Sequence, residues 1–280
     1  MILLSRDRSE QAIHANFRGN KRIALNNELL KQQRDIVKGT IKERKFTASR
    51  WGVAKKQLFI ETKGKCAYCE ANTQVVAHGD VEHYRPKSIY WWLAYCYDNY
   101  LVSCAVCNEV HKKDKFPTLH SALQSVEIFV HTTDSEIQNL TKTLTPDPLN
   151  EVEGLDYATF KTAFDQERPL LVNPYNEDPE KFFAYEADEV LREVAVVPLR
   201  LELRSFVEAS VDIYGLNRTE LLDLRFRVFE TYDTHRLTLE DDGISERTRR
   251  KNEIAIEQMK QSNALFAGMV RYFDRLYRNN

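Results

Sequence analysis

The chain has 280 residues, a formal net charge of −2 and 42% hydrophobic residues, with only 9 glycines and 8 prolines. This composition excludes a disordered chain and is typical of a globular protein rich in helix-forming residues. No run of about eighteen apolar residues is present, and the N-terminal sequence MILLSRDRSE lacks the apolar stretch of a signal peptide. We therefore expect no membrane span and a cytoplasmic location.

The charge is distributed unevenly along the chain. Residues 1–56 carry fourteen Lys and Arg against five Asp and Glu, whereas the remainder is acidic. A basic segment on an acidic body attracts phosphate groups, but a solvated helix face has the same composition, and both interpretations stay open. Apolar residues between 9 and 45 are compatible with one or two helices. Residues 1–50 are therefore predicted to form a basic helical arm.

The next elements lead into a cysteine-rich segment at 65–117. A helix is expected at about 47–62 and is ended by Gly64. Short β-branched runs at 75–76 and 81 flank Gly79, which predicts a hairpin across that glycine. A short helix is expected at 104–114.

The second half of the chain is predicted to be mostly helical. Residues 118–168 are poorly patterned, and we expect surface loops there with one helix near 135–143. The sequence RPLLVNPY predicts a short buried strand at 168–175, and residues 181–198 predict a hairpin. The remaining residues are expected to form three helices, at 199–214, 218–237 and 245–277.

The last of these helices carries a wide apolar face. Its apolar residues exceed those of a narrow packing seam, so some are expected to face a partner chain, although packing on the same chain would explain them equally. The residues concerned are Ile254, Met259, Phe266, Val270 and Phe273.

Four of the five cysteines form two CxxC pairs, Cys66/Cys69 and Cys104/Cys107. Two such pairs supply four thiolates, which suits a closed tetrahedral Zn²⁺ site with no position left for a substrate. We therefore predict a structural zinc. Cys96 is interpreted as an ordinary buried cysteine.

The segment between the CxxC pairs contains the parts needed for phosphodiester hydrolysis. A histidine can act as the base near neutral pH, and carboxylate and amide oxygens suit Mg²⁺. Cationic side chains can hold the neighbouring phosphates. The candidate residues are Glu82, His83, Arg85, Lys87, Asn99, Asn108, His111 and Lys112.

The order of these residues resembles the motif of HNH endonucleases. KCAYCE, GDVEHYRPK and NYLVSCAVCN are similar to the HNH subunit of Septu-type and retron-associated anti-phage systems, and RPLLVNPYNEDPEKFF and YGLNRTELLDLR resemble it more loosely. The resemblance implies an α+β fold in which a zinc-braced ββα-metal module, residues 51–117, is embedded in a mostly helical chain. Residues 118–280 would form the helical C-terminal region with a possible partner-binding surface.

The resemblance also implies roles for individual residues. His83 would be the general base and Asn99 would tie the loop together through backbone hydrogen bonds. Glu82 and Asn108 would hold a catalytic Mg²⁺ or Mn²⁺ ion. Lys112 stands where some members have a histidine ligand, which favours a hard divalent ion. Arg85 and Lys87, together with His111 and Lys112, would contact nucleic acid.

The function expected from this resemblance is metal-dependent nucleic-acid cleavage, on DNA more than RNA, with an ATPase partner subunit. Two alternatives stay open. One is a zinc-finger nucleic-acid-binding protein whose catalytic site has decayed, and the other is a scaffold that only docks a partner.

Overall fold

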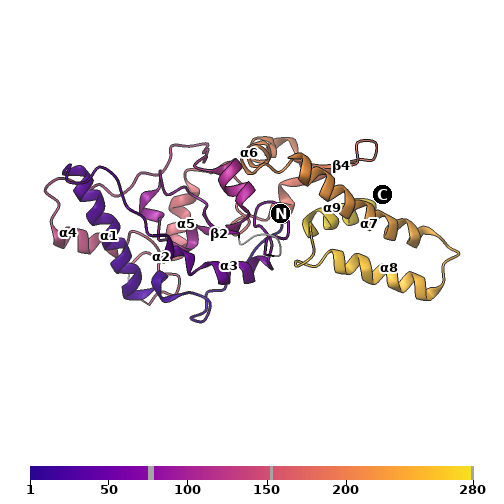
Figure 1. Cartoon of the computed structure of the whole chain (residues 1–280), viewed down its shortest axis with the longest axis horizontal. Coiled ribbons are helices and arrows are strands. Elements are labelled where there is room, and N and C mark those ends of the chain that lie inside the picture. Colours follow the sequence, from indigo (N-terminus) through magenta and orange to yellow (C-terminus); the bar gives the residue numbers. More distant parts are fainter. Residues whose placement is uncertain (75–78, 152–153, 279–280) are drawn as a thin grey trace.

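A computed structural model describes residues 1–74, 79–151 and 154–278 of the chain. The molecule is elongated, with α1 and α4 at one end, a hairpin of α7 and α8 at the other, and a small sheet between them (Figure 1). Helices predominate in the described residues, and the strands among these residues form two antiparallel pairs. This architecture confirms the predicted α+β class. None of the helices in the described residues is long and apolar enough to cross a bilayer.

The α-helices are α1 (Gly19–Val37), α2 (Ala48–Gly52), α3 (Lys55–Thr62), α4 (Asp134–Thr141), α5 (Tyr157–Asp165), α6 (Arg204–Tyr214), α7 (Thr219–Glu240), α8 (Glu246–Met259) and α9 (Ala267–Arg278). The strands are β1 (Asp80–His83), β2 (Tyr100–Ser103), β3 (Phe183–Asp188) and β4 (Glu193–Pro198). A π-helix, η4 (Val106–Lys112), follows β2. Single 3-10 turns are η1 (Ala15–Phe17), η2 (Trp91–Leu93), η3 (Tyr97–Asn99), η5 (Pro179–Lys181) and η6 (Leu201–Leu203).

The basic N-terminal segment packs on the body and does not project as an arm. In α1, the buried Arg22 lies 3.6 Å from Asp147, and the buried Asn26 donates a 2.8 Å hydrogen bond to the Thr141 carbonyl. Further arginines of this segment are paired with carboxylates; the pairs are Arg6–Glu61, Arg8–Asp98, Arg18–Glu151, Arg34–Asp134 and Arg50–Glu28. Much of the local positive charge is therefore neutralised within the chain.

The strand that carries His83 pairs with a distant segment. β1 and β2 are antiparallel, with His83 opposite Tyr100 and Asp80 opposite Ser103. The first run of the hairpin predicted across Gly79, residues 75–76, lies outside the described residues. All four residues of β2 are buried, and this burial favours the pairing of β1 with the distant strand β2.

Three other expectations differ from the structure. Residues 168–175 form a loop with one isolated bridge, Thr118 to Pro169, because Pro169 and Pro174 remove donors that a strand needs. α5 was not anticipated. The predicted helix at 245–277 is two helices, α8 and α9, broken at 260–266. The hairpin predicted within 181–198 is confirmed as β3 and β4.

The apolar face of the C-terminal helices is largely covered by the chain itself. Phe266, Val270 and Phe273 are 2%, 0% and 3% exposed and belong to the core that also contains Cys66, Cys69 and Cys107. The expectation that these three residues face a partner chain is wrong, because α9 packs on β3 and α7 and buries them within the chain. Ile254 on α8 is 48% exposed. The aromatic run at 90–92 is buried in a second core cluster.

Candidate metal centre and active site

The four paired cysteines meet at one point. The sulfur atoms of Cys66, Cys69, Cys104 and Cys107 all lie within 4.8 Å of one another. The first pair sits in a turn after α3, closed by a hydrogen bond from Cys66 N to the Ala71 carbonyl. The second pair lies between β2 and the first turn of η4. Four convergent thiols match the donor set of a tetrahedral structural zinc, so the cluster could hold Zn²⁺ as predicted.

An arginine from the C-terminal region lies against this cluster. Arg218, between α6 and α7, is 3.4 Å from the Cys107 sulfur and also donates a hydrogen bond to the Gly215 carbonyl. A guanidinium beside thiolates offsets their negative charge, and such outer partners tune metal affinity. No local sequence pattern indicates this contact, because more than a hundred residues separate the two groups.

His83 ends β1 in an aromatic enclosure. It is 5% exposed, and its ring meets those of Trp51 and Tyr100 edge-on at 5.0 and 5.1 Å. Its Nε2 lies 3.0 Å from the Ala94 carbonyl oxygen. A carbonyl can only accept, so Nε2 carries the proton and Nδ1 keeps a free lone pair. Burial lowers the pKa of His83 to about 3, which keeps the ring neutral at physiological pH.

Asn99 makes the backbone contacts expected of a loop tie. Its Oδ1 accepts a 2.8 Å hydrogen bond from Arg85 N, and its Nδ2 donates a 2.9 Å hydrogen bond to the Arg85 carbonyl. Nδ2 is also 3.5 Å from the Leu93 carbonyl. This amide therefore fixes the chain just after His83 and next to the loop that supplies the Ala94 carbonyl.

Glu82 is held by a lysine. The residue is 4% exposed, and its Oε1 lies 2.5 Å from Lys112 Nζ. No hydrogen bond of regular geometry reaches this oxygen in the described residues. Lys112 is 0% exposed and donates a further 3.1 Å hydrogen bond to the His83 carbonyl. Burial raises the pKa of Glu82, while Lys112 opposes that rise. The Glu82 oxygen can therefore accept a further contact from a cation. The ammonium group of Lys112 already provides part of the positive charge that this oxygen needs.

Asn108 lies on η4, one turn before Lys112, and is half-buried. A π-helix has a wider turn than an α-helix and occurs frequently at functional sites. Lys112, four residues later on the same helix, is the η4 residue that reaches Glu82. A carboxylate such as that of Glu82 and an amide oxygen such as that of Asn108 are ligand types that suit Mg²⁺ or Mn²⁺, so their assignment as ligands stays a prediction.

Two of the cationic residues expected to contact phosphate are buried and paired with carboxylates. Arg85 is 6% exposed, with Nε 2.5 Å from Glu167, which also accepts 2.7 Å from the Tyr90 hydroxyl. Arg85 and Lys112 are thus buried and paired inside the chain, because the segment after α5 and the β1 carboxylate supply their counter-charges. Lys87 remains half-buried, with Nζ 5.6 Å from the Trp51 ring centroid.

His111 packs on the turn between α6 and α7. A Cβ atom at Gly215 would lie 2.6 Å from its imidazole ring. Gly215 also has a φ of +63°, in the left-handed region that favours glycine. The half-buried His111 therefore serves as a contact between η4 and the C-terminal region.

We expect Gly215→Ala to destabilise the protein by about 1–3 kcal/mol, because the methyl group would meet the imidazole and strain the backbone. Urea unfolding of the zinc-loaded protein measures the change. Gly243→Ala is the control, since Gly243 is exposed and its closest neighbour is an Asp241 side chain. Equal stability of the two variants would contradict the packing of His111 on this turn.

These observations describe an α+β chain in which two antiparallel strands and a short helix follow one another, joined at their ends by four cysteines. Over 195 residues, 65% of this chain, it is 26% identical to the Septu protein PtuB of Bacillus mycoides (strain KBAB4). The chain covers 52% of that protein, about half its length. The resemblance to a Septu protein is therefore confirmed. No family model and no solved structure matches the chain.

Proposed function

We propose that this chain is a metal-dependent HNH-type endonuclease and the nuclease component of an anti-phage defence complex. One observation carries the proposal: the neutral His83, fixed through Nε2 on the Ala94 carbonyl, stands at the end of a strand braced by the cysteine cluster. The similarity to a Septu protein supports the biological setting.

In the proposed reaction, His83 Nδ1 removes a proton from a water molecule that attacks the phosphorus in line with the departing oxygen. Asn99 positions the loop so that the Nε2 hydrogen bond survives this step. An anionic phosphate beside the ring would raise the pKa of His83, which opposes the effect of burial and makes the ring a stronger base. Lys87 beside Trp51 is the candidate that we retain for holding the nucleic-acid backbone.

Glu82 and Asn108 are proposed to hold one Mg²⁺ or Mn²⁺ ion, which neutralises charge on the phosphate and the departing oxygen when bound. Lys112 contributes a fixed positive charge to the same carboxylate. The contacts available to phosphate are independent of base identity, so we expect low sequence specificity. We propose DNA as the substrate ahead of RNA.

Cleavage of plasmid DNA and of structured RNA, with Mg²⁺ or Mn²⁺ and with and without the expected ATPase partner subunit, tests this function. DNA cleavage that requires both the divalent ion and His83 is expected. Zinc-loaded protein that binds DNA but leaves both nucleic acids intact under every condition would refute it.

A second candidate is a zinc-stabilised nucleic-acid-binding or docking protein that has lost catalysis. The ion pair of Glu82 with Lys112 favours it, because this pair occupies a proposed metal ligand. Retained complex formation and unchanged protection against phage in His83→Ala would support this alternative.

The effect of Lys112 on the proposed ion is testable. We expect Lys112→Met to lower stability by about 3–5 kcal/mol in Mg²⁺-free buffer, because the Glu82 carboxylate is left buried without a counter-charge. Mg²⁺ should then restore stability more strongly than in the wild type, and thermal unfolding with and without Mg²⁺ measures both effects. The exposed Lys113→Met is the control. An identical Mg²⁺ shift in all three proteins would exclude an ion beside Glu82.

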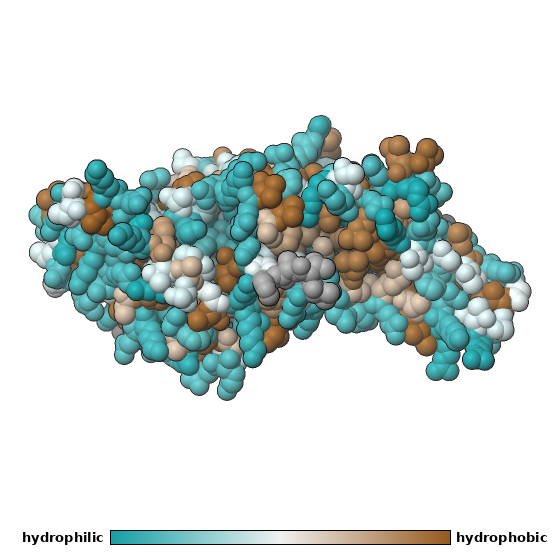
Figure 2. All heavy atoms as spheres, in the orientation of Figure 1, coloured by the Kyte–Doolittle hydropathy of each residue, from teal (hydrophilic) through white to brown (hydrophobic). Residues whose placement is uncertain are grey.

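We also propose a partner subunit, an ATPase, as the resemblance implies. Val190 and Leu191 are 92% and 67% exposed at the tip of the β3–β4 hairpin, where Figure 2 shows an isolated hydrophobic group. Exposed apolar tips are typical of protein contacts. Co-purification with the ATPase should be lost in a Val190→Asp, Leu191→Asp double variant and kept in the control Ile254→Asp on α8. Retention in both variants would exclude the hairpin tip as the contact.

A further inference from the structure

A pocket of about 330 Å³ lies beside the cysteine-braced module, between α5, the loop 168–177 and the start of α6. Its wall includes Tyr84 and Arg85, which directly follow His83. Other parts of the wall come from α5, from the loop RPLLVNPYNE and from three apolar residues between 182 and 206, none of which the proposed reaction uses. A volume of this size is at the lower end of small-molecule sites.

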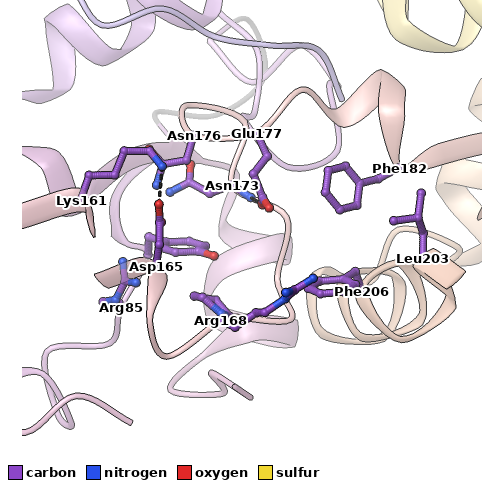
Figure 3. Close-up of a pocket in the computed structure, with 12 residues that line it drawn as sticks. Arg85, Lys161, Asp165, Arg168, Asn173, Asn176, Glu177, Phe182, Leu203 and Phe206 are labelled. Atoms are coloured by element: carbon purple, nitrogen blue, oxygen red, sulfur yellow. Dashed lines mark hydrogen bonds and ion pairs between the residues drawn. The ribbon is translucent and has the colours of Figure 1, made fainter. Parts of the chain in front are cut away.

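One side of the pocket is polar (Figure 3). Lys161 and Asp165 of α5 form an ion pair of 2.5 Å, and Asn176 lies beside them. Glu177 projects into the middle of the pocket, where its Oε2 accepts a 3.4 Å hydrogen bond from Asn173 N. Burial raises the pKa of Glu177, and the nearby Lys161 and Arg168 oppose this effect.

The other side is apolar. Phe182, Leu203 and Phe206 line it, and the two phenylalanine rings are 6.0 Å apart at an angle of 67°. Rings set edge to face leave a corner with two apolar walls. A flat ring can lie against one wall and meet the other with its edge.

Arg168 spans the gap between these two sides. Its guanidinium carbon is 5.6 Å from the Phe206 ring centroid, and the side chain is exposed. Within the described ranges no carboxylate forms an ion pair with it. Its φ of +48° is unfavourable for a residue with a side chain, and hydrogen bonds from Arg168 N to the Asp165 carbonyl and from Leu119 N to the Arg168 carbonyl hold this conformation. Arg168 therefore presents at the rim of the pocket a cation that has no ion-pair partner in the described ranges.

We propose that this pocket binds one nucleotide. The base would lie against the phenylalanine corner, its hydrogen-bonding edge would face Glu177, and its phosphate would pair with Arg168 at the rim. The carboxylate of Glu177 accepts hydrogen bonds, so bases with an exocyclic amino group are favoured over uracil and thymine. The repulsion from Glu177 keeps the phosphate outside the pocket.

The nucleotide could be a free mononucleotide or a residue extruded from a nucleic-acid strand. Both present the same base and phosphate to these residues. The second source rests on the proposed nuclease function, whereas the first does not depend on it.

Ligand-observed NMR titrations of the full zinc-loaded chain with AMP, GMP, CMP and UMP test the proposal. We expect the first three to bind and UMP to bind most weakly. Arg168→Gln should weaken binding by about tenfold, the loss of one charge-assisted contact. Arg204→Gln is the matched control, because Arg204 is an exposed arginine of α6 outside the pocket and should bind as the wild type does. Glu177→Gln should remove the preference over UMP.

A second arm distinguishes the two sources. Single-stranded DNA oligonucleotides with and without one abasic position are compared on His83→Ala, which cannot cleave them if the proposed function holds. A free-nucleotide site predicts binding of mononucleotides and no effect of the abasic position. An extruded base predicts weaker binding of the abasic strand, with this difference lost in Arg168→Gln. Absence of binding in both arms, or wild-type affinity of Arg168→Gln for all ligands, overturns the nucleotide pocket, whatever the outcome of the cleavage assays.

Discussion

Replacing Cys107 by serine is expected to leave the protein largely unfolded or insoluble. Structural zinc contributes an apparent free energy of about 10–16 kcal/mol in small zinc domains, which is comparable to the whole stability of a domain. Cys107 is fully buried and lies in the same core as α6, α7 and α9, so loss of the zinc would open that core as well as the β1–β2 segment. Circular dichroism and elemental analysis measure folding and zinc content.

Cys96→Ser provides the matched control. Cys96 is also buried, at 2% exposure, but it lies in the second core cluster and outside the four-cysteine group. The variant should fold with about one equivalent of zinc and lose about 1–3 kcal/mol, the cost of a buried hydroxyl. A wild-type protein that is well folded without zinc would refute the structural role of the metal.

Replacing His83 by alanine is expected to lower nucleic-acid cleavage by about 10²–10⁴-fold while leaving zinc content and DNA binding intact. The reason is that His83 Nδ1 is the proposed base, and its loss leaves the attacking water without that base. His120→Ala, which changes an exposed histidine, should cut at the wild-type rate. Cleavage by His83→Ala at the wild-type rate would show that another group is the base.

The same residue should affect the pH dependence of stability. Burial lowers the pKa of His83 from 6.5 in the unfolded chain to about 3 in the folded protein. The unfolded chain therefore binds the proton first, and stability is lost as the pH falls from about 6.5 towards 3, by up to about 1.4 kcal/mol per pH unit. Between these limits, urea midpoints should fall less steeply with pH in His83→Ala than in the wild type. Parallel curves would indicate that His83 is exposed in solution.

The local features of the candidate site were accessible from the sequence. CxxC spacing is a short-range signal, so the convergence of four thiols could be predicted from two pairs. The helices at 135–143 and 199–214 and the β3–β4 hairpin were also indicated by local patterns. In each of these cases the signal itself, a CxxC pair, a helical pattern or a hairpin, lies within one short stretch of sequence.

The features that could not be predicted from the sequence depend on partners far along the chain. Nothing near Arg85 in the sequence predicts Glu167, which neutralises it inside the core, and the same holds for Lys112 and Glu82. The sequence around Lys112 indicates a solvated lysine, since hydropathy carries no information about a counter-charge thirty residues away. The break between α8 and α9 follows from burial of Phe266 against the core rather than from a proline or glycine.

The cysteine cluster also determines how the chain would respond to mechanical force. Because the sulfurs of Cys66 and Cys107 are within 4.8 Å of each other, the residues between them form a closed loop as long as the metal stays bound. When the molecule is pulled from its two ends, this loop cannot extend until the metal–thiolate bonds rupture. Its extended length is about 14 nm at roughly 3.5 Å per residue. Proteases that thread their substrates would meet the same obstacle, and His83 lies inside the protected loop.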